Sequence, residues 1–337
     1  MDKSRGTPKN NSAKKIKQHL INTAWFSFGL QAAIQARDAQ LGERLAKVDR
    51  LSKADCHAIL QCVGLQNLNY IEGNGIIKFP HLFDDDDDNV QGKPAVGSSR
   101  RRRRRTPIDI ELGAGSGDWI IHQAHNKPER YFISVELRAD RVARTFAKMV
   151  LSNTTNLCCV GAESGLFLKE RVKKGTVARI FVNHPEPPTQ TLGNDNDLLS
   201  SIGSGGDGAA EPAHMLSSHI LEEAIACLED EGKIVVVTDN LWYGRLLCAT
   251  FTRVGQDKPF FRSQTLCSGF RLVETVGRFD LYEGDPSPAI DHVPSGAGAS
   301  YFDRLWRTGA GTHAERSKRF VLVALKDTSS TPTRGNE

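Results

Sequence analysis

From residue 107 onward, short apolar runs alternate with amphipathic stretches. Five apolar runs have the length and the β-branched content of buried strands: 108–112, 131–137, 156–161, 177–183 and 233–240. Four stretches between them place apolar residues at helical spacing: 118–127, 139–153, 165–175 and 214–232. Two further strands, at 270–284 and 316–326, have no helix evident between them and suit an antiparallel edge. The pattern predicts an α/β fold with a doubly wound, seven-stranded sheet.

The rest of the chain differs in pattern and sets the expected domain boundaries. The stretch from about 18 to 65 has apolar residues three and four apart, which indicates helices, so the fold prediction includes an N-terminal helical extension. Segments rich in Gly, Ser or like charges are expected to lack regular structure. We therefore expect a disordered basic tail at 1–17, the helical extension at 18–83, a low-complexity linker at 84–106, the α/β domain at 107–327 with a flexible insertion at 189–212, and a disordered tail at 328–337.

Composition narrows the class of protein. The 337 residues carry a net charge of only +4, and no apolar run approaches the roughly 20 residues of a bilayer span, so no membrane association is expected. The first twenty residues lack the apolar stretch of a secretory signal, which favours a cytoplasmic or nuclear protein and leaves organellar import open. The seven cysteines form no C-x-x-C pair; we expect reduced thiols and no metal site.

The linker carries two opposite charge runs. Five aspartates at 84–88 precede six arginines at 100–105. The arginines have three interpretations: a solvated insertion neutralised by its acidic neighbour, an arm that contacts nucleic acid, or a nuclear import signal. The sequence leaves all three open.

Each of the first five predicted strands is followed or ended by an acidic residue. These residues are Glu111, Glu136, Glu163, Glu186 and Asp239. Only 40 of the 337 residues are acidic, so chance does not explain this alignment, although capping of the following helices accounts for some of them. The first strand also runs into a glycine-rich turn, "ELGAGSGDW", of the kind that lets a backbone approach a ligand. An acid before the glycines suits a cationic ligand, and Glu136 stands where doubly wound folds place an acid that binds ribose hydroxyls. S-adenosylmethionine is a cationic, ribose-bearing ligand.

Glu186 is distinguished by its surroundings. It lies in "NHPEPP", directly after a strand and between prolines. Proline fixes its own φ and biases the preceding residue away from helix, so the loop should be stiff and extended. We interpret Glu186 as a carboxylate held rigidly to recognise a substrate.

Several segments together resemble a known family. In order, they are "ELGAGSG", "VELR", "NLCCVGAES", "NHPEPP", "TDNLWY" and "SYFDRLW". Their order and spacing resemble the tRNA (guanine-N7) methyltransferases, which are class I methyltransferases. The resemblance covers about 107–326 and the short segment "FPHLF" at 79–83. It implies a class I methyltransferase-like fold, S-adenosyl-L-methionine as cofactor, tRNA as partner and guanine N7 as the methylated atom.

The resemblance also implies roles for single residues. The cofactor site would comprise Glu111, Gly113, Gly115, Gly117, Glu136, Leu137, Ala162 and Glu163. Glu186 takes the position of the active-site aspartate. The substrate side would comprise Asp239, Ser300, Tyr301, Phe302 and Asp303.

The chain departs from the family pattern in three ways. Glutamate replaces aspartate at Glu163 and Glu186, Pro188 stands in place of a tryptophan, and the basic run that normally follows is replaced by an uncharged to acidic stretch. Two alternatives are therefore kept open: a methyltransferase that acts on a protein or a small molecule, and a non-catalytic methyltransferase-like scaffold. Whether a partner subunit is required is also open.

Overall fold

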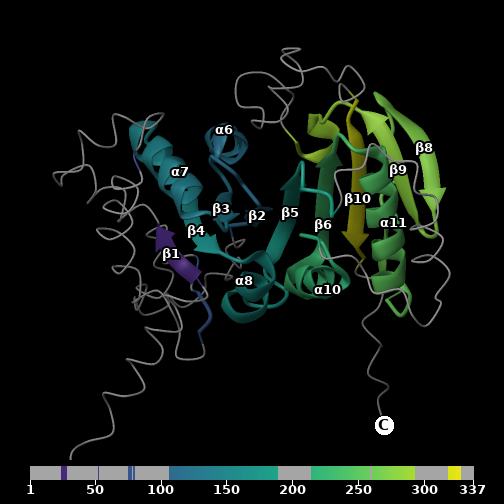
Figure 1. Ribbon diagram of the computed structural model, residues 1–337, viewed down its shortest axis with the longest axis horizontal. Helices are drawn as coiled ribbons and strands as arrows, with labels where there is room; N and C mark the ends of the chain where they lie inside the picture. Colours follow the sequence, from purple (N-terminus) through teal and green to yellow (C-terminus); the bar gives the residue numbers. More distant parts are fainter. Residues whose placement is uncertain are drawn as a thin grey trace, which may run out of the picture.

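A single mixed sheet organises the protein (Figure 1). The computed structural model describes residues 24–28, 52, 75–77, 79, 106–188, 214–258, 260–292 and 318–327. Within these ranges the sheet has ten strands. They are β1 (Ala24–Phe28), β2 (Ile108–Leu112), β3 (Tyr131–Glu136), β4 (Leu157–Ala162), β5 (Val177–Asn183), β6 (Leu228–Thr238), β7 (Phe261–Ser263), β8 (Phe270–Val276), β9 (Phe279–Gly284) and β10 (Phe320–Lys326).

The strand order is that of a doubly wound sheet. It runs β1-β4-β3-β2-β5-β6-β10-β9-β8, and the short β7 pairs with β10. The five strands from β4 to β6 are mutually parallel, whereas β1 and β10 join them antiparallel. The chain winds outward in both directions from the β2–β5 pair, so the carboxyl ends of these two strands form the topological switch point. The predicted fold class and its antiparallel edge are confirmed.

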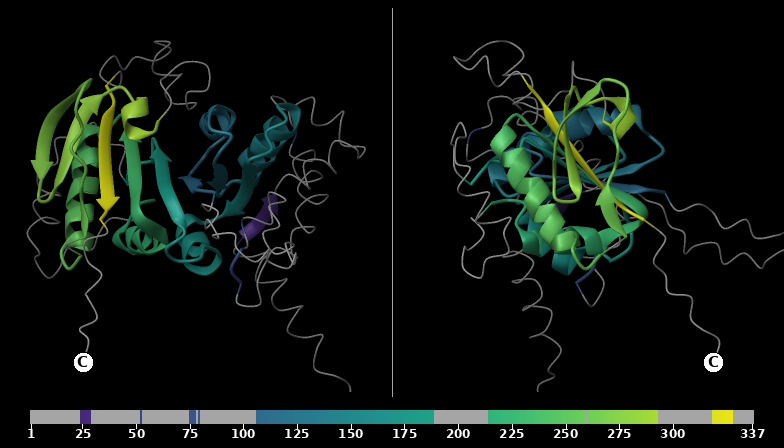
Figure 2. Two further views of the ribbon diagram at one scale, coloured as in Figure 1. Left: turned by 180° about the vertical axis from the view of Figure 1, so that it is seen from behind. Right: turned by 90° about the vertical axis from the view of Figure 1, so that its right-hand side faces the viewer.

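Helices cover both faces of the sheet. One face packs against α8 (Ser164–Arg171), α10 (Ser218–Cys227) and α11 (Leu241–Gly255). The other packs against α6 (Asp118–Asn126), α7 (Ala139–Leu151) and the short 3₁₀ helix η4 (Pro288–Ile290). The end-on view in Figure 2 shows α11 on one side of the twisted sheet. No helix within the described ranges combines the length and the apolar character that a membrane span requires.

The sheet differs from the sequence prediction mainly in its count of strands. Seven strands were predicted and ten are present. The predicted strand 270–284 is a hairpin, because Gly277 adopts φ +62° and turns the chain between β8 and β9. The three-residue β7 and the whole of α11 were not predicted.

Two predicted helical segments also need correction. The helix expected to end at Gly232 ends at Cys227, since the buried Leu228 is already extended and pairs with Val177. At the N-terminus, Ala24–Phe28 was expected to be helical but is a strand on the free edge of β4. Its aromatic-rich sequence favours a strand once an edge is available. Most of 18–83, the linker 84–106 and the insertion 189–212 lie outside the described residues.

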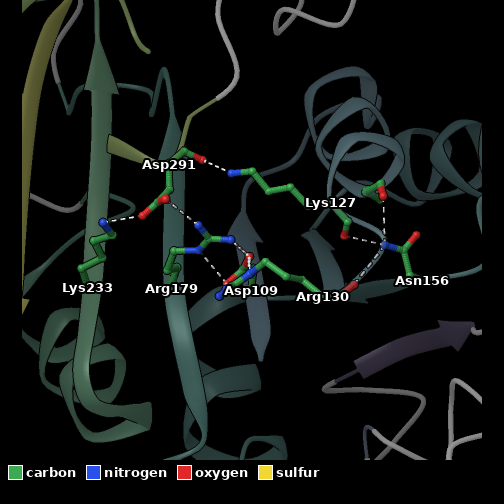
Figure 3. A network of polar contacts seen from close by, with 8 residues as sticks. Asp109, Lys127, Arg130, Asn156, Arg179, Lys233 and Asp291 are labelled. Carbon is green, nitrogen blue, oxygen red and sulfur yellow. Dashed lines mark hydrogen bonds and ion pairs between the residues drawn. The ribbon is translucent and has the colours of Figure 1, made fainter. Parts of the chain in front are cut away.

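A buried cluster of charges ties β2 to β5 (Figure 3). Asp109 is fully buried and binds the guanidinium groups of both Arg179 and Arg130. Arg179 and Lys233 also pair with Asp291, at 3.2 and 2.5 Å, which anchors the segment after η4 to the sheet. Burial alone would lower the pKa of Arg179, but the bonds to Asp109 and Asp291 outweigh it and raise that pKa. The cluster therefore fixes the register of the β2–β5 pair and attaches the segment after η4 to the sheet.

Removing Arg179 should destabilise the protein. Arg179→Met leaves the buried Asp109 carboxylate with Arg130 alone, so the free energy of unfolding should fall by about 3 kcal/mol. Arg271→Met is the matched control, because the Arg271–Glu283 pair is at the exposed edge of the sheet and should matter little. Urea unfolding of both variants measures the difference, and equal losses would contradict the prediction.

Candidate functional site

A large cavity opens at the carboxyl ends of the parallel strands. Its volume is about 1540 Å³, which is more than one ordinary small-molecule pocket requires. All five predicted acids line it: Glu111, Glu136, Glu163, Glu186 and Asp239. Gly113, Gly115 and Leu137 line it as well. The alignment of acids seen in the sequence is therefore a single cluster in space.

The glycine-rich turn between β2 and α6 forms one wall. Gly113, Gly115 and Gly117 all have positive φ. Gly117 is the N-cap of α6, and a Cβ there would lie 2.3 Å from Thr145 Cγ2, so only glycine lets α6 and α7 approach this closely. A Cβ on Gly115 would meet no atom within 4 Å. Gly115 thus leaves open space beside the cavity.

Glu136 closes the turn from the side of β3. It is 5% exposed, and its carboxylate accepts the backbone N–H groups of Gly115 and Arg138, each at 2.9 Å. Arg141 Nη1 lies 3.8 Å from the same carboxylate. These bonds orient Glu136 while leaving acceptor capacity on both oxygens, because a carboxylate has about four lone-pair sites.

Glu163 has a structural task of its own. Its side chain caps α8 and accepts the backbone N–H groups of Gly165 and Leu166, at 2.8 and 2.7 Å. The capping interpretation weighed from the sequence therefore describes this residue correctly. Glu163 still lines the cavity, so capping holds its carboxylate in a defined place there.

Glu111 is the most deeply buried of the five acids. It is 2% exposed, and Oε1 accepts a 2.8 Å hydrogen bond from Asn183 Nδ2. Oε2 is buried and has no hydrogen-bond partner among the described residues. Burial raises the pKa of Glu111 to about 8, and the negative charges of Glu136 and Asp118 add to the shift. The site thus contains a carboxyl group for which a cationic ligand would be the natural partner.

Sequence reasoning missed the residues behind Glu111. Asn183 at the end of β5 contacts His292, which in turn contacts Trp119 on α6. Asn183 directly precedes the "HPEPP" loop, and this position alone could have marked it. His292 is 109 residues further along the chain and carries no comparable local signal.

The proline-rich loop forms another part of the cavity wall. His184 has φ +51°, and its backbone N–H donates to Val237 O at 2.7 Å, which fixes the start of the loop to β6. The His184 ring lies 3.8 Å from Asp239 Oδ1. Glu186 follows at an exposed position on the cavity wall, between Pro185 and Pro187. The loop therefore presents an accessible carboxylate to the cavity.

Some predicted site residues lie elsewhere. Gly117 and Ala162 are not on the cavity wall: Gly117 packs against Thr145, and Ala162 is buried in the core at the end of β4. The predicted substrate-side residues 300–303 (Ser300, Tyr301, Phe302 and Asp303) lie outside the described residues.

Comparisons with known proteins agree with the geometry. The family model "Putative methyltransferase" matches residues 105–191, which contain four of the five clustered acids. The tRNA (guanine-N(7)-)-methyltransferase of Chlamydia caviae is 41% identical over 204 residues, which are 60% of this chain and 71% of that protein. The enzyme of the same name from Chlamydia trachomatis is 37% identical over 202 residues, with the same shares of the two chains.

Among solved structures, the 16S rRNA methyltransferase KamB is similar over 66% of this chain and 88% of its own, at 14% identity and a TM-score of 0.39. That likeness is too weak to add to the argument. The identity and coverage of the chlamydial relatives are sufficient: the chain belongs to the tRNA (guanine-N7)-methyltransferase family.

Proposed function

We propose that the protein transfers a methyl group from S-adenosylmethionine to N7 of a guanine in tRNA. The observation that supports this most directly is that five acids of this family member line one cavity: Glu111, Glu136, Glu163, Glu186 and Asp239. Its volume suits a cofactor and an acceptor base side by side. The chlamydial relatives are named for methylation of guanine N7 in tRNA, and this supports the same acceptor here.

The cofactor end fits S-adenosylmethionine on chemical grounds. When bound, S-adenosylmethionine supplies an electrophilic methyl group on a sulfonium centre. The buried Oε2 of Glu111, which has no hydrogen-bond partner among the described residues, suits a cationic group of such a ligand. Glu136, at the end of the second parallel strand, would accept the ribose hydroxyls, as acids do at this position of doubly wound folds. Glu163 would accept the adenine amino group.

The acceptor end would orient the base. Guanine N7 is an acceptor without a proton, so its methylation needs no general base; alignment and exclusion of water would do the work. Glu186, held by the prolines, would accept the N1–H and N2–H donors of guanine. Methylation makes the purine cationic, and the carboxylates of Glu186 and Asp239 would stabilise that developing charge.

A tRNA substrate also requires positive surface near the cavity. Arg138, Arg245 and Lys318 line the cavity with partly exposed side chains. They would meet phosphates beside the acceptor base. The arginine run 100–105 is a further candidate and lies outside the described residues.

A methylation assay tests the proposed reaction. Unmodified total tRNA is incubated with labelled S-adenosylmethionine and the purified full chain, and the product nucleosides are analysed. We expect label in 7-methylguanosine. Label in another nucleoside, or none while calorimetry shows cofactor binding, would refute the proposed acceptor.

The role of Glu111 predicts a specific pH dependence. Because its pKa is raised to about 8, the folded protein binds a proton that the unfolded chain releases near 4.5. The contribution of Glu111 to stability is therefore present at low pH and is lost as pH rises toward 8, whereas a cationic cofactor should favour the ionised form. We compare the dissociation constants of Glu111→Gln and of the wild type for S-adenosylmethionine. Their ratio, variant over wild type, should rise with pH between pH 6 and 8, by up to about tenfold per pH unit.

Isothermal titration with S-adenosylmethionine measures this ratio. Taking the ratio at each pH cancels the titration of the ligand itself. Glu129→Gln, at an exposed position away from the cavity, is the control and should give a ratio near one at every pH. A flat ratio for Glu111→Gln would contradict the assignment.

Glu186→Gln should separate turnover from cofactor binding. We expect turnover to fall by about tenfold or more, because the amide cannot accept both guanine donors or stabilise positive charge as well as the carboxylate does. The dissociation constant for S-adenosylmethionine should change little. Unchanged turnover would remove Glu186 from the acceptor site.

A further inference from the structure

Three consecutive hydrogen bonds connect a core tryptophan to the cofactor end of the cavity. Trp119 Nε1 donates to His292 Nδ1 at 3.2 Å, His292 Nε2 lies 2.9 Å from Asn183 Oδ1, and Asn183 Nδ2 donates to Glu111 Oε1 at 2.8 Å. The four side chains come from α6, the segment after η4, β5 and β2. Trp119 ends the glycine-rich segment "ELGAGSGDW", but the sequence motifs assign no role to it or to His292.

The donor at the start determines the direction of the whole chain. An indole N–H can only donate, so His292 Nδ1 must be unprotonated to accept it. The imidazole proton is then on Nε2, which donates to Asn183 Oδ1. The amide of Asn183 consequently turns its NH₂ group toward Glu111. Each group has one role, and reversing any of them would place two donors or two acceptors face to face.

Aromatic packing holds the imidazole in place. His292 is 6% exposed and Trp119 is 3% exposed. The two ring centroids are 4.7 Å apart, and the Phe181 ring centroid lies 6.3 Å from that of His292. A proton on Nδ1 would oppose the indole N–H.

Charged groups on the surrounding elements hold the backbone next to His292, directly after η4. Asp291, adjacent to His292, pairs with Lys233 on β6 and with Arg179 on β5, and its carbonyl accepts from Lys127 at 2.6 Å. Figure 3 shows these side chains converging on Asp291. At the other end of the hydrogen-bond chain, two further acids act on Glu111: Asp118 on α6 and Glu136 on β3. His292 is therefore fixed from its backbone as well as from its ring.

We propose that His292 is a positioning residue for the cofactor. Trp119 holds it as the neutral Nε2–H tautomer, and in this form His292 sets the orientation of the Asn183 amide. Glu111 then engages Asn183 through Oε1 and keeps Oε2 for a cationic group of S-adenosylmethionine. This rests on the proposed function for the identity of the cofactor, and it goes beyond that function in assigning the support of Glu111 to residues 119 and 292. His292 itself contacts no ligand and acts only through Asn183.

Two substitutions of His292 separate positioning from simple packing. His292→Phe keeps a ring but removes both hydrogen bonds, and the dissociation constant for S-adenosylmethionine should rise by about tenfold. His292→Gln can place an amide N–H near the position of Nε2 and restore donation to Asn183, so its affinity should return to within about threefold of the wild type. His219→Phe, on the exposed side of α10, is the matched control and should bind like the wild type.

Affinity that falls equally in His292→Phe and His292→Gln would assign His292 to packing alone and overturn the proposal. Thermal unfolding of each variant shows whether it remains folded at the temperature of the titration. The readout is cofactor binding and not methyl transfer. A wild-type protein that binds S-adenosylmethionine but leaves tRNA unmodified would refute the proposed acceptor and leave this test valid; a wild type that binds no S-adenosylmethionine would overturn both.

A spectroscopic measurement tests the tautomer without any variant of His292. Long-range ¹H–¹⁵N correlation spectra of the wild type should show His292 as the Nε2–H tautomer throughout pH 5.5–8. Trp119→Phe removes the donor that blocks Nδ1, so its spectra should show a mixture of tautomers or a protonated ring at the lower pH. A wild-type His292 that carries its proton on Nδ1, or on both nitrogens, would refute the proposal directly.

Discussion

The register between β2 and β5 is the constraint on which the site depends. It pairs Asp109 with Arg179 and brings Glu111 alongside Phe181, so that Asn183 reaches Glu111 from the next position on the same face. Because side chains alternate along a strand, a slip of one residue would send Asp109 and Glu111 to the opposite face of the sheet. The buried ion pair between Asp109 and Arg179 would lose its partner in such a slip. One register therefore specifies both the charge cluster and the cavity wall above it.

The charge cluster around Asp109 and the carboxyl group of Glu111 lie on this same face, but they differ in how many hydrogen-bond and ion-pair partners they have. Asp109 binds two guanidinium groups, and Asp291 is held by cations from two strands. Glu111, two residues further along β2, has one hydrogen bond and a pKa raised by burial. Unfavourable burial that persists next to a well-satisfied network is typical of functional sites, because the surrounding structure supplies the stability that the site lacks. The contrast supports a ligand role for Glu111 more than its position alone does.

The sequence predicted the parts of the fold that local pattern controls. The strands at 108–112 and 177–183 were predicted to the residue, since strands buried on both faces are continuous apolar runs. The clustering of the acids at the ends of these strands followed from the parallel topology, because the carboxyl ends of parallel strands meet at one edge of the sheet. By contrast, β1 is a strand because the edge of β4 is available to it, and His292 reaches Asn183 across 109 residues. Such features depend on tertiary contacts, which no local pattern records. Predictions for 300–303 stay predictions.

Two carboxylates of the cavity, Glu111 and Glu186, lie in opposite environments. Glu111 is enclosed and supported by a directional chain of hydrogen bonds, and burial raises its pKa to about 8. Glu186 is exposed on a loop that prolines stiffen and that His184 ties to β6. Carboxylates in such different surroundings can serve different tasks in one site. Under the proposed function, a proton equilibrium at Glu111 would govern cofactor binding alone, while geometry at Glu186 would govern the choice of base, so the two steps could change independently in evolution.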